Sequence, residues 1–178
     1  MTTGAEPEAE VSGPSRLPTL QIQTPRLPDG AFVLEASQWV AQPVEQAFSF
    51  FADADNLERI TPPFLGFSIR TPRPIAMAEG ALIEYRLRLM GVPMGWLTRI
   101  ESWNPDRHFV DLQLRGPYAL WRHHHSFEPA NHGTWVRDRV EYVLPFAPWS
   151  LPVHPVFVRP MLERIFTFRR DAIRRLLG

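Results

Sequence analysis

Five consecutive segments of strand length occupy residues 81–144, and this run of short strands limits the possible folds more than any other feature of the sequence. Every connection between the segments contains Gly or Pro, which is typical of turns. Connections of this length join neighbouring strands as antiparallel hairpins. The predicted strands are residues 81–89, 94–103, 108–115, 118–128 and 134–144.

Two short helices are predicted before these strands and one long helix after them. Pro43 stands at the first position of a helix whose apolar residues follow at helical spacing. Asp53 is the predicted cap of the second short helix, over residues 56–60. At the other end of the chain, an apolar stripe over residues 158–176 predicts a long C-terminal helix, which Pro160 begins or kinks.

The order of elements indicates an α+β fold. Two further strands, over residues 32–38 and 64–71, bring the sheet to about seven strands. One long amphipathic helix packed on one face of a curved antiparallel sheet is a stable layered arrangement. Because one helix is too narrow to fill that face, we expect a cavity between the helix and the sheet.

The first 28 residues differ in composition from the rest of the chain. They contain five prolines and almost no large apolar side chains. Such a segment cannot bury enough apolar surface to offset the entropy that it loses on ordering. We therefore predict a disordered N-terminal tail over residues 1–28 and one folded domain over residues 29–178.

Composition and charge exclude several classes of protein. The 178-residue chain contains no Cys, which excludes disulfides, thiolate metal sites and cysteine nucleophiles. Its 19 basic residues, all of them Arg, balance 19 acidic residues, so no basic surface for nucleic acid is expected. No apolar run approaches the roughly 20 residues needed to cross a bilayer, and the N-terminus lacks the apolar core of a secretion signal. We expect a cytoplasmic protein without a cofactor.

Three successive histidines, residues 123–125, lie in the predicted strand over residues 118–128. On a strand, His123 and His125 share one face with Trp121, and His124 lies on the other. A turn that pairs residues 128 and 133 places Asp138 opposite His123 on a mostly apolar face, which is the predicted inner face. A buried carboxylate is unfavourable unless it is paired, so His123 is the nearest candidate partner of Asp138.

Three interpretations of this pair stay open. It is a structural pair that stiffens the sheet, or a polar anchor for a ligand carbonyl or hydroxyl group at the floor of the cavity. In the third interpretation His123 and Asp138 form a catalytic acid–base pair, or His123, His125 and Asp138 bind a metal ion. Because neither a fourth ligand nor partners that would orient the histidines can be named, we predict no metal site.

Aromatic residues of neighbouring strands are the predicted walls of the cavity. Strand alternation directs Tyr85, Trp96 and Trp121 inward, and Tyr142 shares the inner face of the last strand. The Tyr85 hydroxyl needs a hydrogen-bond partner when it is buried. The predicted ligand-binding residues are Tyr85, Trp96, Trp121, His123, His125, Asp138 and Tyr142.

Two polar groups are interpreted as solvent-exposed. Asp111, Gln113 and Arg115 alternate along one strand, and a tight turn at Gly116-Pro117 places them on the outer face, whereas a bulge at this turn would direct them inward. Four arginines in the last turns of the C-terminal helix favour its dipole, with contact to anionic lipid head groups as the alternative. These are Arg169, Arg170, Arg174 and Arg175.

Three runs of sequence resemble a known superfamily. They are PVEQAFSFFADADNLERITPPFLGF, RHFVDLQLRGPYALWRHHHSFEP and GTWVRDRVEYVLPF. They resemble the START-like helix-grip superfamily (SRPBCC), in particular its ligand-binding or polyketide cyclase/dehydrase-like branch, and the resemblance covers residues 31–177. It implies a helix-grip fold in which the sheet and the C-terminal helix enclose a cavity. Members of the superfamily carry lipids, sterols, polyketides and quinones, and only some of them are enzymes.

We therefore expect a domain that binds a small or medium hydrophobic ligand, such as a lipid, a polyketide or a quinone-like molecule. The alternative is a cyclase/dehydrase-type enzyme, in which His123, held by Asp138, removes an acidic proton from a ketone and Tyr85 or an arginine stabilises the enolate. A third class is a protein-interaction module without a ligand. The predicted partner is the small hydrophobic molecule, with transient membrane contact as an option, and the oligomeric state stays open.

Overall fold

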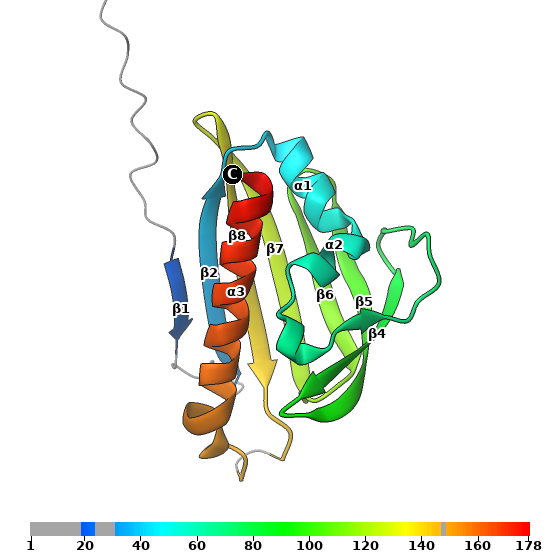
Figure 1. The fold of residues 1–178 in the computed structure, drawn as a ribbon, viewed down its shortest axis with the longest axis vertical. Helices are drawn as coiled ribbons and strands as arrows, with labels where there is room; N and C mark the ends of the chain where they lie inside the picture. Colours follow the sequence, from blue (N-terminus) through cyan, green and yellow to red (C-terminus); the bar gives the residue numbers. More distant parts are fainter. Residues whose placement is uncertain (1–18, 24–30, 147–148) are drawn as a thin grey trace, which may run out of the picture.

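A computed structural model describes residues 19–23, 31–146 and 149–178 of the chain. Within these residues an eight-stranded antiparallel sheet has the order β1-β2-β8-β7-β6-β5-β4-β3 (Figure 1). Its strands are β1 Thr19–Gln23, β2 Phe32–Val40, β3 Ser68–Ile69, β4 Leu82–Leu89, β5 Val92–Asn104, β6 His108–Arg115, β7 Leu120–Ala130 and β8 Gly133–Val143. The α+β helix-grip prediction is confirmed: six of the seven predicted strands are present, the seventh is reduced to the two residues of β3, and β1 adds one more.

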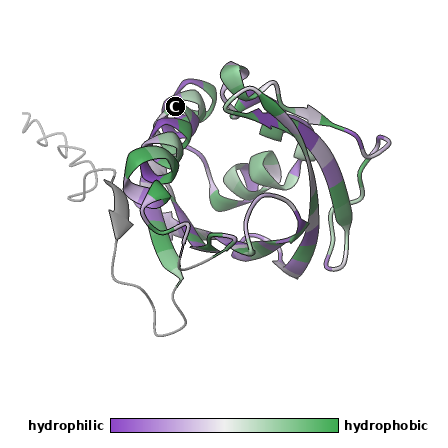
Figure 2. Ribbon diagram, turned by 90° about the horizontal axis from the view of Figure 1, so that it is seen from below, coloured by the Kyte–Doolittle hydropathy of each residue, from purple (hydrophilic) through white to green (hydrophobic). Residues whose placement is uncertain are grey.

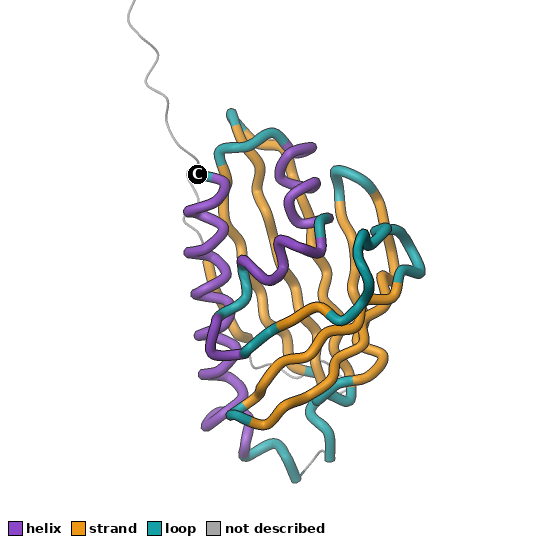
Figure 3. The backbone as a smooth tube through the Cα atoms, turned by 45° about the vertical axis from the view of Figure 1, so that its right-hand side comes forward, coloured by secondary structure: helices purple, strands orange, loops and turns teal. Residues whose placement is uncertain are grey.

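The sheet curves around its helices. The helical elements are α1 Val44–Ala52, α2 Ala54–Arg59, the 3-10 turn η1 Pro63–Leu65, the π turn η2 His154–Val158 and α3 Arg159–Leu177. Seen end on, the sheet wraps around α3 and the short helices (Figure 2), and Figure 3 shows α1 and α2 on the same side of the sheet as α3. None of the helices in the described part of the chain is long and apolar enough to cross a membrane.

Local sequence explains where the helices begin and end. The Asp55 backbone N–H donates a hydrogen bond of 2.9 Å to the Asp53 side chain, which caps α2 as predicted. Pro160 lies in the first turn of α3, directly after η2. Val158 and Arg159 both have right-handed helical dihedrals, and the Arg159 N–H bonds to the His154 carbonyl, so Pro160 stands where the π turn passes into the α-helix. The strand predicted over residues 64–71 is mostly wrong, because η1 ends at Gly66 in the left-handed region and only β3 pairs with β4.

The hairpin between β7 and β8 has a different register from the predicted one. The strands run on to a two-residue turn, in which His132 has a φ of 57°, so Ala130 pairs with Gly133. His125 therefore lies opposite Asp138, and His123 lies opposite Val140. The predicted opposition of His123 and Asp138 is wrong by two residues, but an even shift keeps every side chain on its predicted face.

The hairpin between β6 and β7 reverses a second prediction. Asp111 pairs with His123 and lies on the inner face, so its assignment to the outer face is wrong. The connection is wider than a two-residue turn, because the Gln113 side chain bonds to the Tyr118 backbone, with Nε2 donating to the carbonyl oxygen over 2.7 Å. The register differs from the predicted one by one residue, which brings Asp111 to the inner face. Arg115, beyond an irregularity in the pairing with β5, stays exposed as predicted and pairs with Glu84.

Strand β1 corrects the predicted extent of the N-terminal tail. Thr19–Gln23, within the segment predicted as disordered, pairs with β2 from Thr19 opposite Ser37 to Gln23 opposite Val33. The rest of the predicted tail, up to residue 28, lies outside the described residues. β1 covers the edge of β2, an edge that would otherwise offer free backbone groups to other chains.

Deleting residues 1–24 is therefore expected to destabilise the protein, whereas deleting residues 1–18, which leaves β1 in place, is not. Losing five paired residues at a cost of about 1–3 kcal/mol should lower the Tm by roughly 2–12 °C. Thermal unfolding of the two truncated proteins measures the effect. An unchanged Tm in the longer deletion would show that β1 adds nothing to stability.

Candidate functional site

A cavity of about 190 Å³ lies between α3 and the inner face of the sheet. Aromatic and aliphatic side chains from β4, β5, β6, β7, α2 and α3 form most of its lining. Among them are Leu57, Phe67, Ile83, Tyr85, Leu87, Trp96, Phe109, Tyr118, Trp121, Leu162, Ile165 and Phe166. The cavity is thus a largely apolar space. Its charged side chains from the sheet and α3 gather at one region, called the polar floor here, and further polar residues (Asp53, Asn56, Thr61 and Thr98) line other parts of it.

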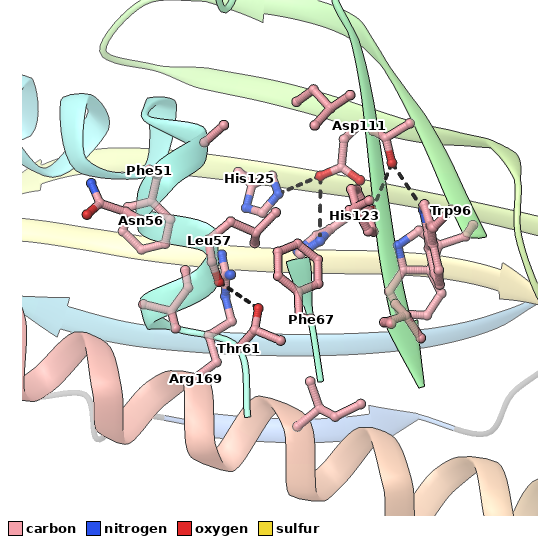
Figure 4. A pocket seen from close by; sticks show the side chains of 18 of the residues that line it. Phe51, Asn56, Leu57, Thr61, Phe67, Trp96, Asp111, His123, His125 and Arg169 are labelled. Atoms are coloured by element: carbon pink, nitrogen blue, oxygen red, sulfur yellow. Dashed lines mark hydrogen bonds and ion pairs between the residues drawn. The ribbon is translucent and has the colours of Figure 1, made fainter. Parts of the chain in front are cut away.

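The polar floor consists of Asp111, His123, His125 and Arg169, which all line the cavity. The Asp111 carboxylate accepts a hydrogen bond of 2.9 Å from Nε2 of His125, and its Oδ2 lies 3.8 Å from Nδ1 of His123. Figure 4 shows Arg169 extending from α3 toward this floor. The polar side chains of the floor therefore come from two strands, β6 and β7, and from the helix α3.

Asp138 lies behind the two histidines and does not line the main cavity. Its Oδ1 accepts a hydrogen bond of 2.9 Å from Nε2 of His123, and Nδ1 of His125 lies 2.8 Å from the same oxygen, outside hydrogen-bonding geometry. Its Oδ2 is 3.4 Å from Nε of Arg169. The predicted His123–Asp138 contact thus forms diagonally across the strands, and the structure adds His125 and Arg169 to it.

The shifts in pKa describe how charge is shared in this cluster. Burial would raise the pKa of Asp138, but the Arg169 guanidinium and the two histidines hold that pKa well below its usual range. Burial also opposes ionisation of Asp111, yet the hydrogen bond from His125 and the nearby cations lower its pKa. Both carboxyl groups are therefore ionised at neutral pH.

The pKa values of His123 and His125 shift in opposite directions. Burial, followed by the charge of His125, lowers the pKa of His123 despite its bond to Asp138. Burial acts in the same direction on His125, but its contacts with Asp111 and Asp138 outweigh burial and raise its pKa. One imidazolium at His125 and one guanidinium at Arg169 then balance the two carboxylates.

A second polar group in the cavity wall is built on Thr98. Its Oγ1 accepts a hydrogen bond of 3.0 Å from Nε1 of Trp96 and is 2.9 Å from the Tyr85 hydroxyl. Burial and the charge of Asp111 raise the pKa of Tyr85, so its hydroxyl stays protonated at neutral pH. Tyr85, Trp96 and Trp121 line the cavity, as predicted.

Tyr142 does not line the cavity, in contrast to its predicted place in a ligand site. Its side chain is fully buried in the core, and its hydroxyl lies 2.7 Å from Nε2 of His154. The His154 ring also stacks on Phe32 with 3.8 Å between the ring centroids. Tyr142 is therefore a structural residue that joins η2 to the sheet.

Sequence reasoning missed Asp111, Arg169 and Thr98 as residues of the site. The assignment of Arg169 to the solvated end of the helix is wrong, because this residue is buried and its guanidinium lies over the Phe51 ring. The helical spacing does indicate that Arg169 is buried. It lies three residues after Phe166 and four before Ile173 on the buried face of α3, which also includes Leu162.

Comparisons with known proteins agree with this architecture. A family model described as polyketide cyclase / dehydrase and lipid transport matches residues 40–172. No curated protein matches the chain.

Solved structures share the fold at low sequence identity. Protein Ms6760 from Mycobacterium smegmatis has a TM-score of 0.65 at 15% identity, over 90% of this chain and 98% of that one. Zhui aromatase/cyclase from Streptomyces sp. R1128 has a TM-score of 0.64 at 16% identity, over 80% and 91% of the two chains. TTHA0849 from Thermus thermophilus has a TM-score of 0.57 at 17% identity, over 82% and 99%.

The Asp138→Ala variant is expected to lose about 3–5 kcal/mol of stability, because it removes the carboxylate paired with the buried Arg169 guanidinium and the acceptor of the His123 hydrogen bond. The matched control is Asp171→Ala, which removes an exposed acid from an ion pair on α3 and should cost less than about 1 kcal/mol. Urea unfolding of both variants measures the difference. Equal, small losses would show that Asp138 does not neutralise the buried guanidinium.

Proposed function

The chain belongs to the polyketide cyclase / dehydrase and lipid transport family, and we propose that it binds a small hydrophobic ligand in the cavity between α3 and the sheet. The observation that carries this proposal is the contrast within the cavity lining. Aromatic walls surround a compact polar floor, which is the arrangement expected for a ligand with an apolar body and one polar group.

The size of the cavity favours a compact ligand. Its volume of about 190 Å³ exceeds that of an engineered apolar cavity of about 150 Å³ that binds benzene. A molecule of one or two rings fits this space, whereas a long acyl chain does not fit without movement of α3 or its neighbours. A quinone-like or aromatic ligand is therefore the best match among the candidate classes.

The polar floor also indicates how such a ligand would be oriented. Trp96 and Tyr85 form a stacked wall with ring centroids 5.8 Å apart, and Trp121 stands edge-on to Trp96 at 5.5 Å. A flat apolar body would pack against these rings. Its carbonyl or hydroxyl group would then face Asp111, His123 and Arg169 at the floor.

One observation favours a second candidate function, a cyclase-type reaction on a ketone. His123 lines the cavity while Asp138 accepts the proton of its Nε2, so in the neutral ring Nδ1 holds the lone pair. Nδ1 would take the acidic proton from the carbon beside the carbonyl group. The guanidinium of Arg169 or the hydroxyl of Tyr85 would donate a hydrogen bond to the resulting enolate oxygen.

Filling the cavity should abolish ligand binding without unfolding the protein. Ile165→Trp replaces an aliphatic side chain on the cavity wall by the larger indole ring. The matched control Leu176→Trp adds the same ring at an exposed position of the same helix, α3. We expect the fluorescence of 8-anilinonaphthalene-1-sulfonate to rise on mixing with the wild-type protein and the control, and 2-naphthol to displace the dye. Ile165→Trp should reduce dye affinity at least tenfold. Equal affinity in all three proteins would place the dye outside this cavity.

The catalytic candidate predicts proton exchange on a two-ring ketone. In D2O, wild-type protein should accelerate exchange of the protons beside the carbonyl group of 1-tetralone, as followed by NMR. His123→Gln should reduce this rate by about 10²–10⁴-fold, the usual contribution of a general base. A wild-type rate equal to that of buffer would leave binding as the function and remove catalysis of this kind.

A further inference from the structure

The two histidines of the cavity floor are each held between two carboxylates. On the far side, Nε2 of His123 and Nδ1 of His125 lie 2.9 and 2.8 Å from Oδ1 of Asp138. On the cavity side, Nε2 of His125 and Nδ1 of His123 lie 2.9 and 3.8 Å from Oδ2 of Asp111. The two rings, with centroids 3.7 Å apart and planes tilted by 36°, thus each direct one nitrogen toward the same Asp111 oxygen.

Hydrogen bonding alone does not satisfy this arrangement. An ionised carboxylate only accepts hydrogen bonds, so Asp138 requires the proton of His123 on Nε2. The lone pair of a neutral His123 then lies on Nδ1 and faces Oδ2 of Asp111, which is a second acceptor.

We infer that Asp111, His123 and His125 bind a divalent transition-metal ion of the Zn²⁺ type through Oδ2, Nδ1 and Nε2. The ligand atoms that these residues offer all lie within 4.8 Å of one another. Bonds from Zn²⁺ to His nitrogen and carboxylate oxygen measure about 2.0–2.2 Å, so small side-chain adjustments bring three such atoms around one ion. Binding of the ion releases the proton that lies between His125 and Asp111 to solvent, and the ion takes a place among Nε2 of His125, Nδ1 of His123 and Oδ2 of Asp111.

The neighbours of the three ligands support the same conclusion. A histidine that binds a metal usually holds its other ring nitrogen against a carboxylate or a carbonyl oxygen, and Asp138 provides that carboxylate for His123. Nδ1 of His125 lies 2.8 Å from the same oxygen but outside hydrogen-bonding geometry. Sequence reasoning named no such partner and offered Asp138 as a third ligand, which led to the prediction of no metal. The structure puts Asp111 in the ligand position instead and Asp138 behind the rings.

The donor set defines the class of metal. Two imidazole nitrogens and one carboxylate oxygen suit Zn²⁺, Co²⁺, Ni²⁺ or Fe²⁺, whereas Mg²⁺ and Ca²⁺ prefer oxygen ligands throughout. Three protein ligands leave at least one coordination position of Zn²⁺ open, as in catalytic zinc sites. All three residues line the cavity, so that position is available to a ligand oxygen. This last step rests on the proposed function, whereas the metal site itself does not.

The test is a metal titration of the full chain after removal of metals with a chelator. Co²⁺ binding, followed by its visible d–d absorption, and Zn²⁺ competition against Co²⁺ should show one site per chain. Asp111→Asn and His123→Gln should each weaken binding at least tenfold. The matched control His124→Ala, on the same strand but the opposite face, removes a histidine that stacks on His108 and should leave this binding unchanged.

Several results would overturn the metal site. Absence of a one-to-one Co²⁺ complex in the wild-type protein is one of them. Binding that is lost in His124→Ala and kept in His123→Gln is another, because it would place the ion on the outer pair with His108. Near-UV circular dichroism checks that each variant is folded, and two separate ligand variants keep the test valid if one of them is not. Dye binding to the metal-free protein is measured in parallel, so failure of the cavity proposal is distinguished from failure of the metal site.

Discussion

A buried ion pair joins Arg169 of α3, the only long helix of the described chain, to Asp138 of β8 in the sheet, with 3.4 Å between Nε and Oδ2. Apolar contacts from Leu162, Phe166 and Ile173 hold α3 in place, but such contacts are non-directional and tolerate small rotations of the helix. A buried guanidinium is different, because it is stable only where its counter-ion is. We interpret this ion pair as the interaction that fixes the rotation of α3, and hence the shape of the cavity beneath it.

Aromatic rings in contact across neighbouring strands form the wall of the cavity. Tyr85, Trp96, Tyr118 and Trp121 are in contact with one another, with centroid distances of 4.7 to 5.9 Å between successive rings. Aromatic rings have few rotatable bonds, and the hydrogen bonds of Tyr85 and Trp96 to Thr98 restrict them further. Collapse would have to break these contacts as well as bend the sheet, so the free volume under α3 is a built feature of the fold.

The sequence predicts the faces of the strands better than the pairs that they form. His123, His125 and Asp138 are predicted on the inner face, and they lie there although the predicted register is wrong by two residues. For Asp111 the predicted register of β6 against β7 is wrong by one residue, so this side chain lies on the inner face and not on the predicted outer face. The cause is the hydrogen bonding of the Gln113 side chain to the Tyr118 backbone, which no periodicity of apolar residues reveals. The prediction for Arg169 fails for another reason, since an arginine on an apolar stripe has a buried partner only once α3 is docked on β8.

The proposed ligand binding, proton transfer and metal binding at this site all depend on one atom, Nδ1 of His123. Nδ1 of His123, a residue that lines the cavity, lies 3.8 Å from Oδ2 of Asp111, and its lone pair would accept a ligand hydroxyl proton, remove a proton from carbon, or bind a metal ion, but only one of these at a time. Asp138 enforces this choice, because its bond to Nε2 fixes the ring tautomer in every case. The occupant of the space between His123 and Asp111 therefore decides which reaction the cavity supports. A metal in that space would exclude His123 as a base and would make a ligand oxygen, rather than a ligand C–H bond, the group that approaches the floor.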